Sequence, residues 1–131
     1  MQIKIFIKNY YKTIIWFLLM LYMLFTPTSG IPKSSFLNIP HGDKIIHFGM
    51  FALLTVLFAV DNEKMILKTI LYFSLFSVSF AASSELIQYS LITGRNGNIY
   101  DFLADMAGLA IGLLTYQFIL TKYLVKKKIR N

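Results

Sequence analysis

Residues 44–92 read KIIHFGMFALLTVLFAV, DNEK, MILKTILYFSLFSVSFAASSELIQYSLI, which is two long apolar stretches joined by a short polar tetrapeptide. A helix needs about 17 to 25 predominantly apolar residues to cross a bilayer, and both stretches reach that length. The tetrapeptide from Asp61 to Lys64 predicts a tight turn, so the two helices should form an antiparallel pair. The second helix is the longer one and must tilt or protrude. This hairpin indicates an integral membrane protein.

Two further apolar stretches flank the hairpin, one near each end of the chain. Hydrophobic residues make up 56% of the sequence and charged residues only 15%, which is too apolar for an ordinary soluble domain of 131 residues. The stretches are also apolar nearly all round, whereas a surface helix of a soluble protein has a polar face. We therefore predict an all-α fold, an integral membrane bundle of four transmembrane helices in a single domain, residues 1–131. The predicted helices cover about 9–25, 44–60, 65–92 and 102–121.

Basic residues are distributed unevenly between the two sides of this predicted bundle. Most of them precede the apolar part of the first helix, begin the third helix or follow the fourth: Lys4, Lys8, Lys12, Lys64, Lys68, Lys122, Lys126, Lys127, Lys128 and Arg130. The other side holds only Lys33, Lys44 and Arg95. Cytoplasmic loops of membrane proteins carry an excess of Lys and Arg. We therefore expect both termini in the cytoplasm and the loops around His41 and Arg95 outside.

The first apolar stretch is the weakest transmembrane segment. Ile14 to Phe25 is short, and only the addition of Asn9 to Thr13 brings it near the lower limit of about 17 residues. A signal peptide is the rival interpretation, with a basic start, a short apolar centre and residues 26–30, TPTSG, as the cleavage region. The aromatic residues of the apolar centre and the missing A-x-A pattern are poor signal-peptide features. We favour a retained helix.

The composition also narrows the function classes. A net charge of +7 is compatible with nucleic-acid binding, but the basic residues sit at the ends of apolar spans, where they fit helix orientation and contact with anionic lipid. The chain has no cysteine, which excludes disulfides, thiolate catalysis and thiolate metal ligands. We expect membrane lipids as partners, no nucleic acid and no cofactor. The oligomeric state stays open.

Small and turn-forming residues mark two further features. Residues 26–40 hold all three prolines and are expected to form an outer loop. Gly108 and Gly112, preceded by Ala104, form a small-residue ridge on the fourth helix that would let another helix approach closely. Small residues are also simply common in membrane helices, so the ridge alone does not establish such a contact.

Polar residues recur in pairs near the outer ends of three predicted helices. The pairs are three or four residues apart and therefore share a helix face: Asp43 with His47, Glu85 with Gln88, and Asp101 with Asp105. At about 1.5 Å per residue, Glu85 lies roughly 10 Å inside the outer end of its helix, and His47 and Asp105 lie about one turn inside theirs. Ionisable residues at such depth face a bundle interior or a wet cavity. We expect the pairs to converge, with Arg95 neutralising part of their charge.

Most of these residues also have a simpler interpretation. Asp43 reads as an interfacial residue, and Asp101 as a helix cap or first-turn residue. Gln88 reads as an ordinary interhelical contact, and His47 as a hydrogen-bonded packing residue. Glu85 is the hardest to explain in this way, because its own helix offers no nearby Lys or Arg to balance its charge.

Three short motifs run through these residues in order: DKIIHF at 43–48, ELIQ at 85–88, and GRNGNIYD at 94–101 followed by Gly108 and Gly112. Their pattern resembles that of the VanZ-like family, D-K-x-x-H-F, E-x-x-Q and G-R-x-x-x-x-x-D-x-x-x-N-x-x-G-x-x-x-G. The resemblance covers about residues 43–112, which is most of the chain. Asp105 departs from the pattern, because it stands where the family usually has Asn and so adds an acid to the cluster.

The resemblance implies a small, multi-pass protein of the bacterial inner membrane with a role in the cell envelope. The namesake of the family is associated with low-level resistance to the glycopeptide teicoplanin. No settled biochemical activity comes with the family, so the resemblance does not decide whether the protein is an enzyme.

We expect a polar site in the outer leaflet that binds or modifies the headgroup of an amphiphile, such as an anionic lipid or a lipid-linked envelope precursor. His47 and Glu85 are the candidate catalytic residues, with the imidazole as general acid or base, oriented by Asp43 or Glu85. The guanidinium of Arg95 is suited to a phosphate or carboxylate. The candidate ligand-binding residues are Asp43, Lys44, Gln88, Arg95, Asp101 and Asp105.

Three other functions compete with this one. The first is a structural or interaction protein, in which the same polar residues form an interhelical clamp. Transport is a second, although four spans are few for a monomeric transporter and the sequence shows no inverted repeat. A metal site with nitrogen and oxygen ligands is the third. It is a weak signal, because the cluster has one histidine and no H-E-x-x-H spacing, and we predict no metal.

Overall fold

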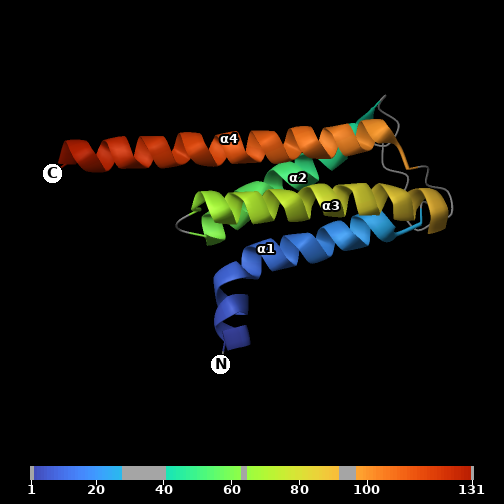
Figure 1. Ribbon diagram of the computed structural model, residues 1–131, viewed down its shortest axis with the longest axis horizontal. Helices are drawn as coiled ribbons and strands as arrows, with labels where there is room; N and C mark the ends of the chain where they lie inside the picture. The colour runs from blue at the N-terminus through green and yellow to red at the C-terminus, as the bar shows by residue number, and fades with distance from the viewer. Residues whose placement is uncertain (1, 28–40, 63–64, 92–96, 131) are drawn as a thin grey trace.

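The computed structural model describes residues 2–27, 41–62, 65–91 and 97–130, and within these ranges it contains α-helices and no strand. The helices are α1 (Gln2–Phe25), α2 (Gly42–Asp61), α3 (Leu67–Leu91) and α4 (Ile99–Arg130), as Figure 1 shows. The prediction of an all-α fold with four helices is confirmed. Most of the predicted outer loop, residues 28–40, lies outside the described residues, and so does Arg95.

The two central helices begin and end within two residues of their predicted bounds, whereas the outer two are longer than predicted. α1 begins at Gln2 instead of about residue 9, and α4 runs from Ile99 to Arg130 instead of from about 102 to 121. Hydrophobicity marks only the part of a helix that can lie in lipid. The flanking lysines and arginines are good helix formers, so each helix continues past its apolar part.

Three of the helices are long and apolar enough to cross a membrane, namely α2, α3 and residues 99–119 of α4. α1 is not among them, although its apolar part packs in the bundle. α1 bends at Tyr10, whose backbone is not helical (φ −113°, ψ 21°), and the segment before it turns away from the other helices (Figure 1). The protein is therefore a membrane protein with several apolar helices, and the fourth span at about 9–25 stays a prediction.

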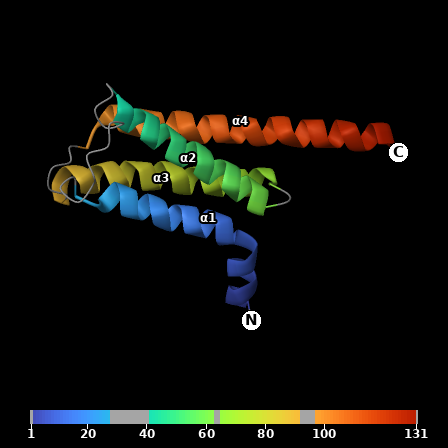
Figure 2. The ribbon, with the colours of Figure 1, turned by 180° about the vertical axis from the view of Figure 1, so that it is seen from behind.

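The helices form an elongated bundle in which α2 makes its most extensive contact with α4. α2 also contacts α1, and α3 contacts α4 and α1. Figures 1 and 2 show that both chain ends lie on the side of the bundle where α2 ends and α3 begins. The opposite end brings together the start of α2, the end of α3 and the start of α4.

The glycine ridge of α4 makes the contact with α2 possible. A Cβ atom on Gly108 would collide with the backbone carbonyl oxygen of Phe48. A Cβ on Gly112 would lie 2.5 Å from the Cβ of Thr55 and 2.9 Å from the carbonyl oxygen of Ala52. Real side chains do not approach one another so closely, so a residue with a side chain at either position would push the helices apart. The predicted close approach of another helix is confirmed, and that helix is α2.

Aromatic and aliphatic side chains from all four helices fill the interior. Phe51 and Met20 are fully buried, and the rings of Phe58 and Phe73 stack with their centroids 4.0 Å apart. Trp16 of α1 donates its indole N–H to the carbonyl oxygen of Met50 on α2 at 3.0 Å. Large apolar side chains cover much of the outer surface as well, as expected of helices that contact lipid.

Candidate functional site

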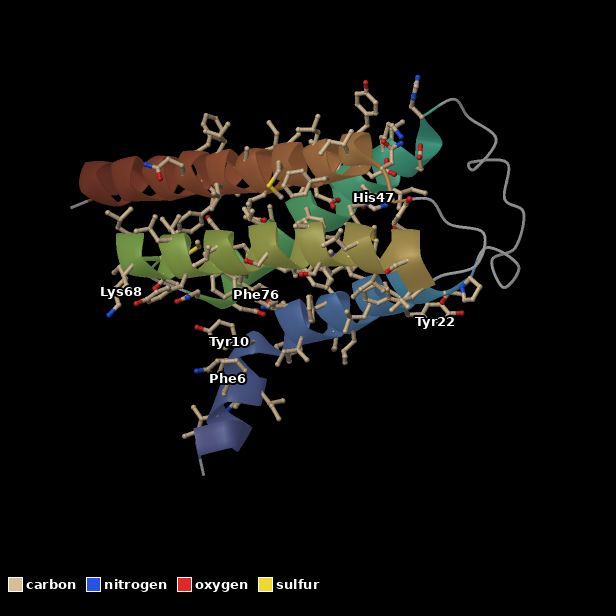
Figure 3. The ribbon with its side chains drawn as sticks, turned by 45° about the vertical axis from the view of Figure 1, so that its right-hand side comes forward. Phe6, Tyr10, Tyr22, His47, Lys68 and Phe76 are labelled. Carbon is tan, nitrogen blue, oxygen red and sulfur yellow. The ribbon has the colours of Figure 1, made fainter. Side chains whose placement is uncertain are left out.

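The predicted polar residues lie mainly at the end of the bundle where α2 and α4 begin and α3 ends. Figure 3 shows His47 at this end and Lys68 at the opposite end. Because α3 runs antiparallel to α2, residues near its C-terminal end reach the first turns of α2 and α4. The helix directions therefore decide which polar pairs can meet.

An acid–histidine pair forms the centre of the site. His47 Nδ1 lies 3.0 Å from Asp105 Oδ1, and both side chains are buried within the bundle. An ionised carboxylate only accepts hydrogen bonds, so the imidazole N–H is the donor. Gly108 is one turn from Asp105 and packs on Phe48, the residue after His47. The close helix contact thus holds donor and acceptor together.

Glu85 joins the same cluster from α3. Its Oε1 lies 3.7 Å from His47 Nδ1, and its Oε2 accepts a hydrogen bond of 2.8 Å from the backbone N–H of Asn98. Asn98 also caps α4, because its side-chain oxygen accepts from the N–H of Tyr100 at 3.0 Å. A Cβ on Gly97 would collide with the backbone carbonyl oxygen of Glu85. A glycine therefore allows the start of α4 to lie against α3.

Lys44 connects the cluster to the surface. Its ammonium group lies 2.9 Å from Asp101 Oδ1 and 3.0 Å from Asp43 Oδ2. The Asp101 side chain is buried, whereas that of Asp43 is 53% exposed. Asp101 lies in the first turn of α4, where the helix dipole favours a carboxylate, and Asn98 is the cap. Lys44 therefore balances the charge of Asp101, and no other lysine of the described ranges pairs with the deeper acids Glu85 and Asp105.

Two buried carboxylate oxygens of this cluster lack a hydrogen-bond partner among the described residues. Glu85 Oε1 and Asp105 Oδ2 are buried and have no hydrogen-bond partner within the described part of the chain. Leaving a buried charged oxygen without a partner is costly. Two such atoms in one cluster indicate that the cluster is suited to take up a further donor or a cation. His47, Glu85 and Asp101 each offer one donor atom, and these atoms lie within 4.8 Å of one another.

The structure brings together five of the eight residues predicted for the site, which are Lys44, His47, Glu85, Asp101 and Asp105. Gln88 is buried but faces α1, where its side-chain amide donates to the carbonyl oxygen of Leu24 at 3.0 Å. Asp43 lies at the rim and reaches the cluster only through Lys44. Arg95 lies outside the described residues. We had expected Asp43 or Glu85 to orient His47, whereas Asp105 makes the shorter contact.

Asn98 is the site residue that the sequence analysis did not single out. Its contribution to Glu85 comes from the backbone N–H, which every residue except proline has, so no side-chain pattern marks it. Its position just before an apolar run is a helix-cap signal. Apart from this helix-cap signal and Gly97, nothing in the sequence indicates the hydrogen bond between the Asn98 N–H and Glu85.

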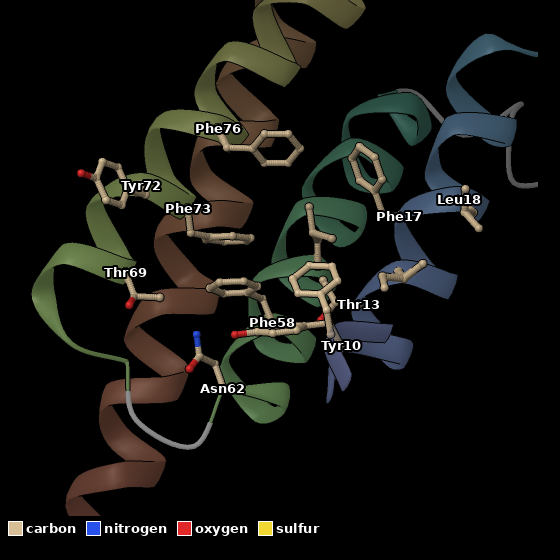
Figure 4. A pocket seen from close by; sticks show the side chains of 13 residues that line it. Tyr10, Thr13, Phe17, Leu18, Phe58, Asn62, Thr69, Tyr72, Phe73 and Phe76 are labelled. Atoms are coloured by element: carbon tan, nitrogen blue, oxygen red, sulfur yellow. The ribbon is translucent and has the colours of Figure 1, made fainter. Parts of the chain in front are cut away.

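Two of the surface cavities between described residues lie at different ends of the bundle. One, of about 390 Å³, is bounded by Glu85 and by apolar side chains such as Leu86, Ile99 and Phe102. The other, of about 580 Å³, lies toward the opposite end between α1, α2 and α3 (Figure 4). Aromatic rings line much of it, including those of Phe73 and Phe76. Only the smaller cavity has a member of the acid–histidine cluster in its wall.

The fold and the site define a class, a membrane protein of apolar helices with a buried acid–histidine cluster at one end of the bundle. The family model described as VanZ/LLP1 matches residues 5–120, so the chain belongs to this family. The match confirms the resemblance of the three motifs and extends it over α1. No curated protein and no solved structure matches the chain.

Proposed function

We propose that this protein is a multi-pass protein of the bacterial inner membrane that binds the headgroup of an envelope amphiphile in the outer leaflet. Both termini would then be cytoplasmic, as the lysine distribution predicts. The acid–histidine cluster would lie at the outer end of the bundle, at the depth of lipid headgroups. A membrane-helical bundle of the VanZ/LLP1 family is the framework on which this proposal is built.

The proposal rests on the position of Glu85, which lies between the buried cluster and a surface cavity. Glu85 belongs to the buried cluster and is also one of the residues that line the 390 Å³ cavity. The rest of that wall is largely apolar, including Leu86, Tyr89 and Phe102. A cavity with one acidic residue in its lining and otherwise largely apolar walls fits a molecule that combines a polar head with a hydrocarbon chain.

The charges of the described residues indicate which headgroup fits. Glu85, which lines the cavity, has an oxygen with no hydrogen-bond partner among the described residues, so the headgroup should offer a hydroxyl or ammonium donor to it. Lys44, whose side chain is 23% exposed, is the cation that the described part of the cluster offers to a phosphate. Arg95 remains a predicted phosphate ligand from the sequence alone. A phospholipid with a donor-bearing headgroup, or a lipid-linked precursor with hydroxyl groups, meets these requirements.

If the protein modifies this molecule, His47 is the residue to transfer a proton. The imidazole is oriented by Asp105 at 3.0 Å and faces Glu85 at 3.7 Å. A histidine held in one orientation by a carboxylate is a common general acid or base. A change in teicoplanin susceptibility of expressing cells is the envelope phenotype that this proposal predicts.

The binding test uses purified full-length protein in detergent with EDTA and counts retained lipids by native mass spectrometry. The probes are phosphatidylglycerol and phosphatidylethanolamine, which carry donors, and phosphatidylcholine, which carries none. Wild type should retain one donor-bearing lipid, and Glu85→Gln should weaken its binding about tenfold, because a hydrogen bond to a charged acceptor contributes about 1.5–3 kcal/mol. Ser90→Ala, an exposed position on the same helix, is the matched control. Equal retention of all three lipids, or unchanged binding by Glu85→Gln, would refute the proposal.

A second candidate function is structural, and specific contacts favour it. The pairs His47–Asp105, Lys44–Asp101 and Gln88–Leu24 all connect different helices. In this case the protein would act by altering the membrane or a partner, and the cluster would be an interhelical clamp. Glu85→Gln and His47→Ala would then lower the amount of folded protein in membranes. Folded variants that lack the envelope phenotype would argue against the clamp.

A further inference from the structure

Three metal-ligating side chains converge inside the bundle, each from a different helix. His47 comes from α2, Glu85 from α3 and Asp101 from α4, and all three are buried. Their donor atoms lie within 4.8 Å of one another. Nitrogen and oxygen ligands bind Zn²⁺ at about 2.0–2.2 Å, so small side-chain movements would bring all three atoms to one ion.

The unpaired oxygens are a second and independent indication. Glu85 Oε1, which faces His47, has no hydrogen-bond partner within the described ranges, and neither does Asp105 Oδ2. Asp105 is fully buried, so its orphaned oxygen does not reach water at the surface. A cation bound by Glu85 would supply the partner that its oxygen lacks, and its positive charge would offset that of the nearby Asp105 carboxylate.

The charges agree with a divalent ion. Among the described residues, Lys44 balances Asp101, which leaves Glu85 and Asp105 as two carboxylates beside one histidine. Even a protonated His47 would leave one negative charge unbalanced inside an apolar bundle. A divalent cation with a neutral imidazole balances both carboxylates. We therefore propose that this cluster binds one divalent metal ion, with His47, Glu85 and Asp101 as its ligands.

The residues around the three ligands suit this role. Metal-bound histidines usually donate their other ring N–H to a carboxylate, and His47 Nδ1 lies 3.0 Å from Asp105 Oδ1. The carboxylates are held as well, Glu85 by the N–H of Asn98 and Asp101 by Lys44. Asp105 is thus a positioning residue that orients the imidazole for the ion.

The donor set points to a class of metal. One imidazole with two carboxylates suits Mn²⁺, Fe²⁺ or Zn²⁺. Ca²⁺ prefers six to eight oxygen ligands, and Cu⁺ prefers sulfur, so neither fits this set. Two carboxylates, one histidine and an adjacent cavity would also leave coordination positions open. The inference does not depend on the proposed lipid binding, because the ion needs only residues of this chain.

The test measures metal binding by the purified full-length chain in detergent, without added lipid. After treatment with EDTA and its removal, Zn²⁺ binding is followed by calorimetry and Mn²⁺ binding by electron paramagnetic resonance. Wild type should bind one ion per chain. Glu85→Gln and Asp101→Asn should lose this binding, and Asp105→Asn should weaken it about 10- to 100-fold, as measured for other metal sites when an outer-shell partner is removed.

The chain has two histidines, which provides a matched control. His41 is exposed at the start of α2, so His41→Gln should bind the ion as wild type does. Spin-echo spectra of bound Mn²⁺ should show nitrogen coupling in both wild type and His41→Gln. Because His47 is then the remaining imidazole, this result identifies the ligand even where His47→Gln does not fold.

Three outcomes would overturn the metal site: no binding of Zn²⁺ or Mn²⁺ by wild type at millimolar concentration, binding that survives in folded Glu85→Gln and Asp101→Asn, or nitrogen coupling that disappears in His41→Gln. The lipid test is performed in EDTA, so the two proposals can fail separately. Lipid binding with no metal binding would overturn only the metal site.

Discussion

Both ends of the bundle bury carboxylate groups, but only at one end does every described buried carboxylate oxygen have a hydrogen-bond partner. At the end where α2 stops, Asp61 accepts hydrogen bonds from Lys12 Nζ, the Thr13 hydroxyl and the Thr13 backbone N–H, at 2.8 to 3.2 Å. At the other end, Glu85 and Asp105 each have one oxygen that lacks a hydrogen-bond partner among the described residues. The contacts at the first end are those of a structural clamp, and the oxygens at the second end are those on which the proposed binding site depends.

The two cavities differ in the same way. The larger one lies toward the Asp61 end, where aromatic rings such as those of Tyr10 and Phe76 line it (Figure 4). Its lining suits a hydrocarbon chain and contains no Asp or Glu, whereas Glu85 lines the smaller cavity. Burial alone therefore does not identify a functional site. A buried carboxylate oxygen without a hydrogen-bond partner, on a residue that lines a cavity, is a more informative feature than burial.

The largest effect is expected from the α2–α4 contact that assembles the His47 end. Gly108→Ala should destabilise the protein by about 3 kcal/mol or more, because its Cβ would collide with the backbone of Phe48. The measurement is the unfolding midpoint in detergent and the amount of folded protein in membranes. Gly49→Ala is the matched control, since a Cβ there meets nothing within 4 Å. Equal stability of the two variants would contradict the close contact.

The next effect should come from the structural clamp. Asp61→Asn should lower the free energy of unfolding by about 2 kcal/mol, because an amide cannot accept from Lys12 and both Thr13 donors as the carboxylate does. The Asp61 side chain is only 1% exposed, so water cannot replace these bonds. Denaturant titration of the purified protein gives the value. An unchanged midpoint would show that this end is not a clamp.

Gln88→Ala should have a smaller effect. The variant loses one hydrogen bond to the Leu24 carbonyl oxygen between α3 and α1, and such bonds in membrane bundles are worth about 0.6 kcal/mol on average. Ser90→Ala, whose exposed hydroxyl bonds within its own helix to Leu86, should change stability even less. If Gln88→Ala also removed lipid or metal binding, Gln88 would belong to the site after all.

Asp105→Asn should change the stability of the metal-free protein by less than about 0.5 kcal/mol. The amide oxygen can still accept from His47, and the substitution removes a buried negative charge whose second oxygen has no hydrogen-bond partner among the described residues. Asn is also the residue that the VanZ-like motif usually has at this position. The free energies of unfolding of Asp105→Asn and Asp61→Asn, both measured in EDTA, give the comparison. A loss as large as that of Asp61→Asn would mean that Asp105 is a clamp residue.

The sequence predicted the convergence of the site because helical spacing and depth depend only on residue number. His47, Glu85 and Asp105 lie at matching depths on three helices, and α2 and α4 meet at the glycine ridge that the sequence also marks. Contacts to backbone atoms could not be predicted in this way. The partners of Glu85 at Asn98 and of Gln88 at Leu24 are such atoms.

The clamp at Asp61 and the bend of α1 were also missing from the sequence analysis. Asp61 reads as a turn residue, and nothing in the pattern of Lys12 and Thr13 shows that α1 packs beside it. The bend at Tyr10 interrupts a segment whose residues favour a continuous helix. Both features depend on tertiary packing, which local spacing does not encode.

The most direct test of the central difference compares the unfolding free energies of Glu85→Gln and Asp61→Asn, measured side by side in EDTA. Glu85→Gln keeps an oxygen for the Asn98 N–H and removes an unpaired charge, so it should be as stable as wild type or slightly more stable. Asp61→Asn should lose about 2 kcal/mol. Equal losses in the two variants would show that both ends are clamps and would contradict a binding site at Glu85.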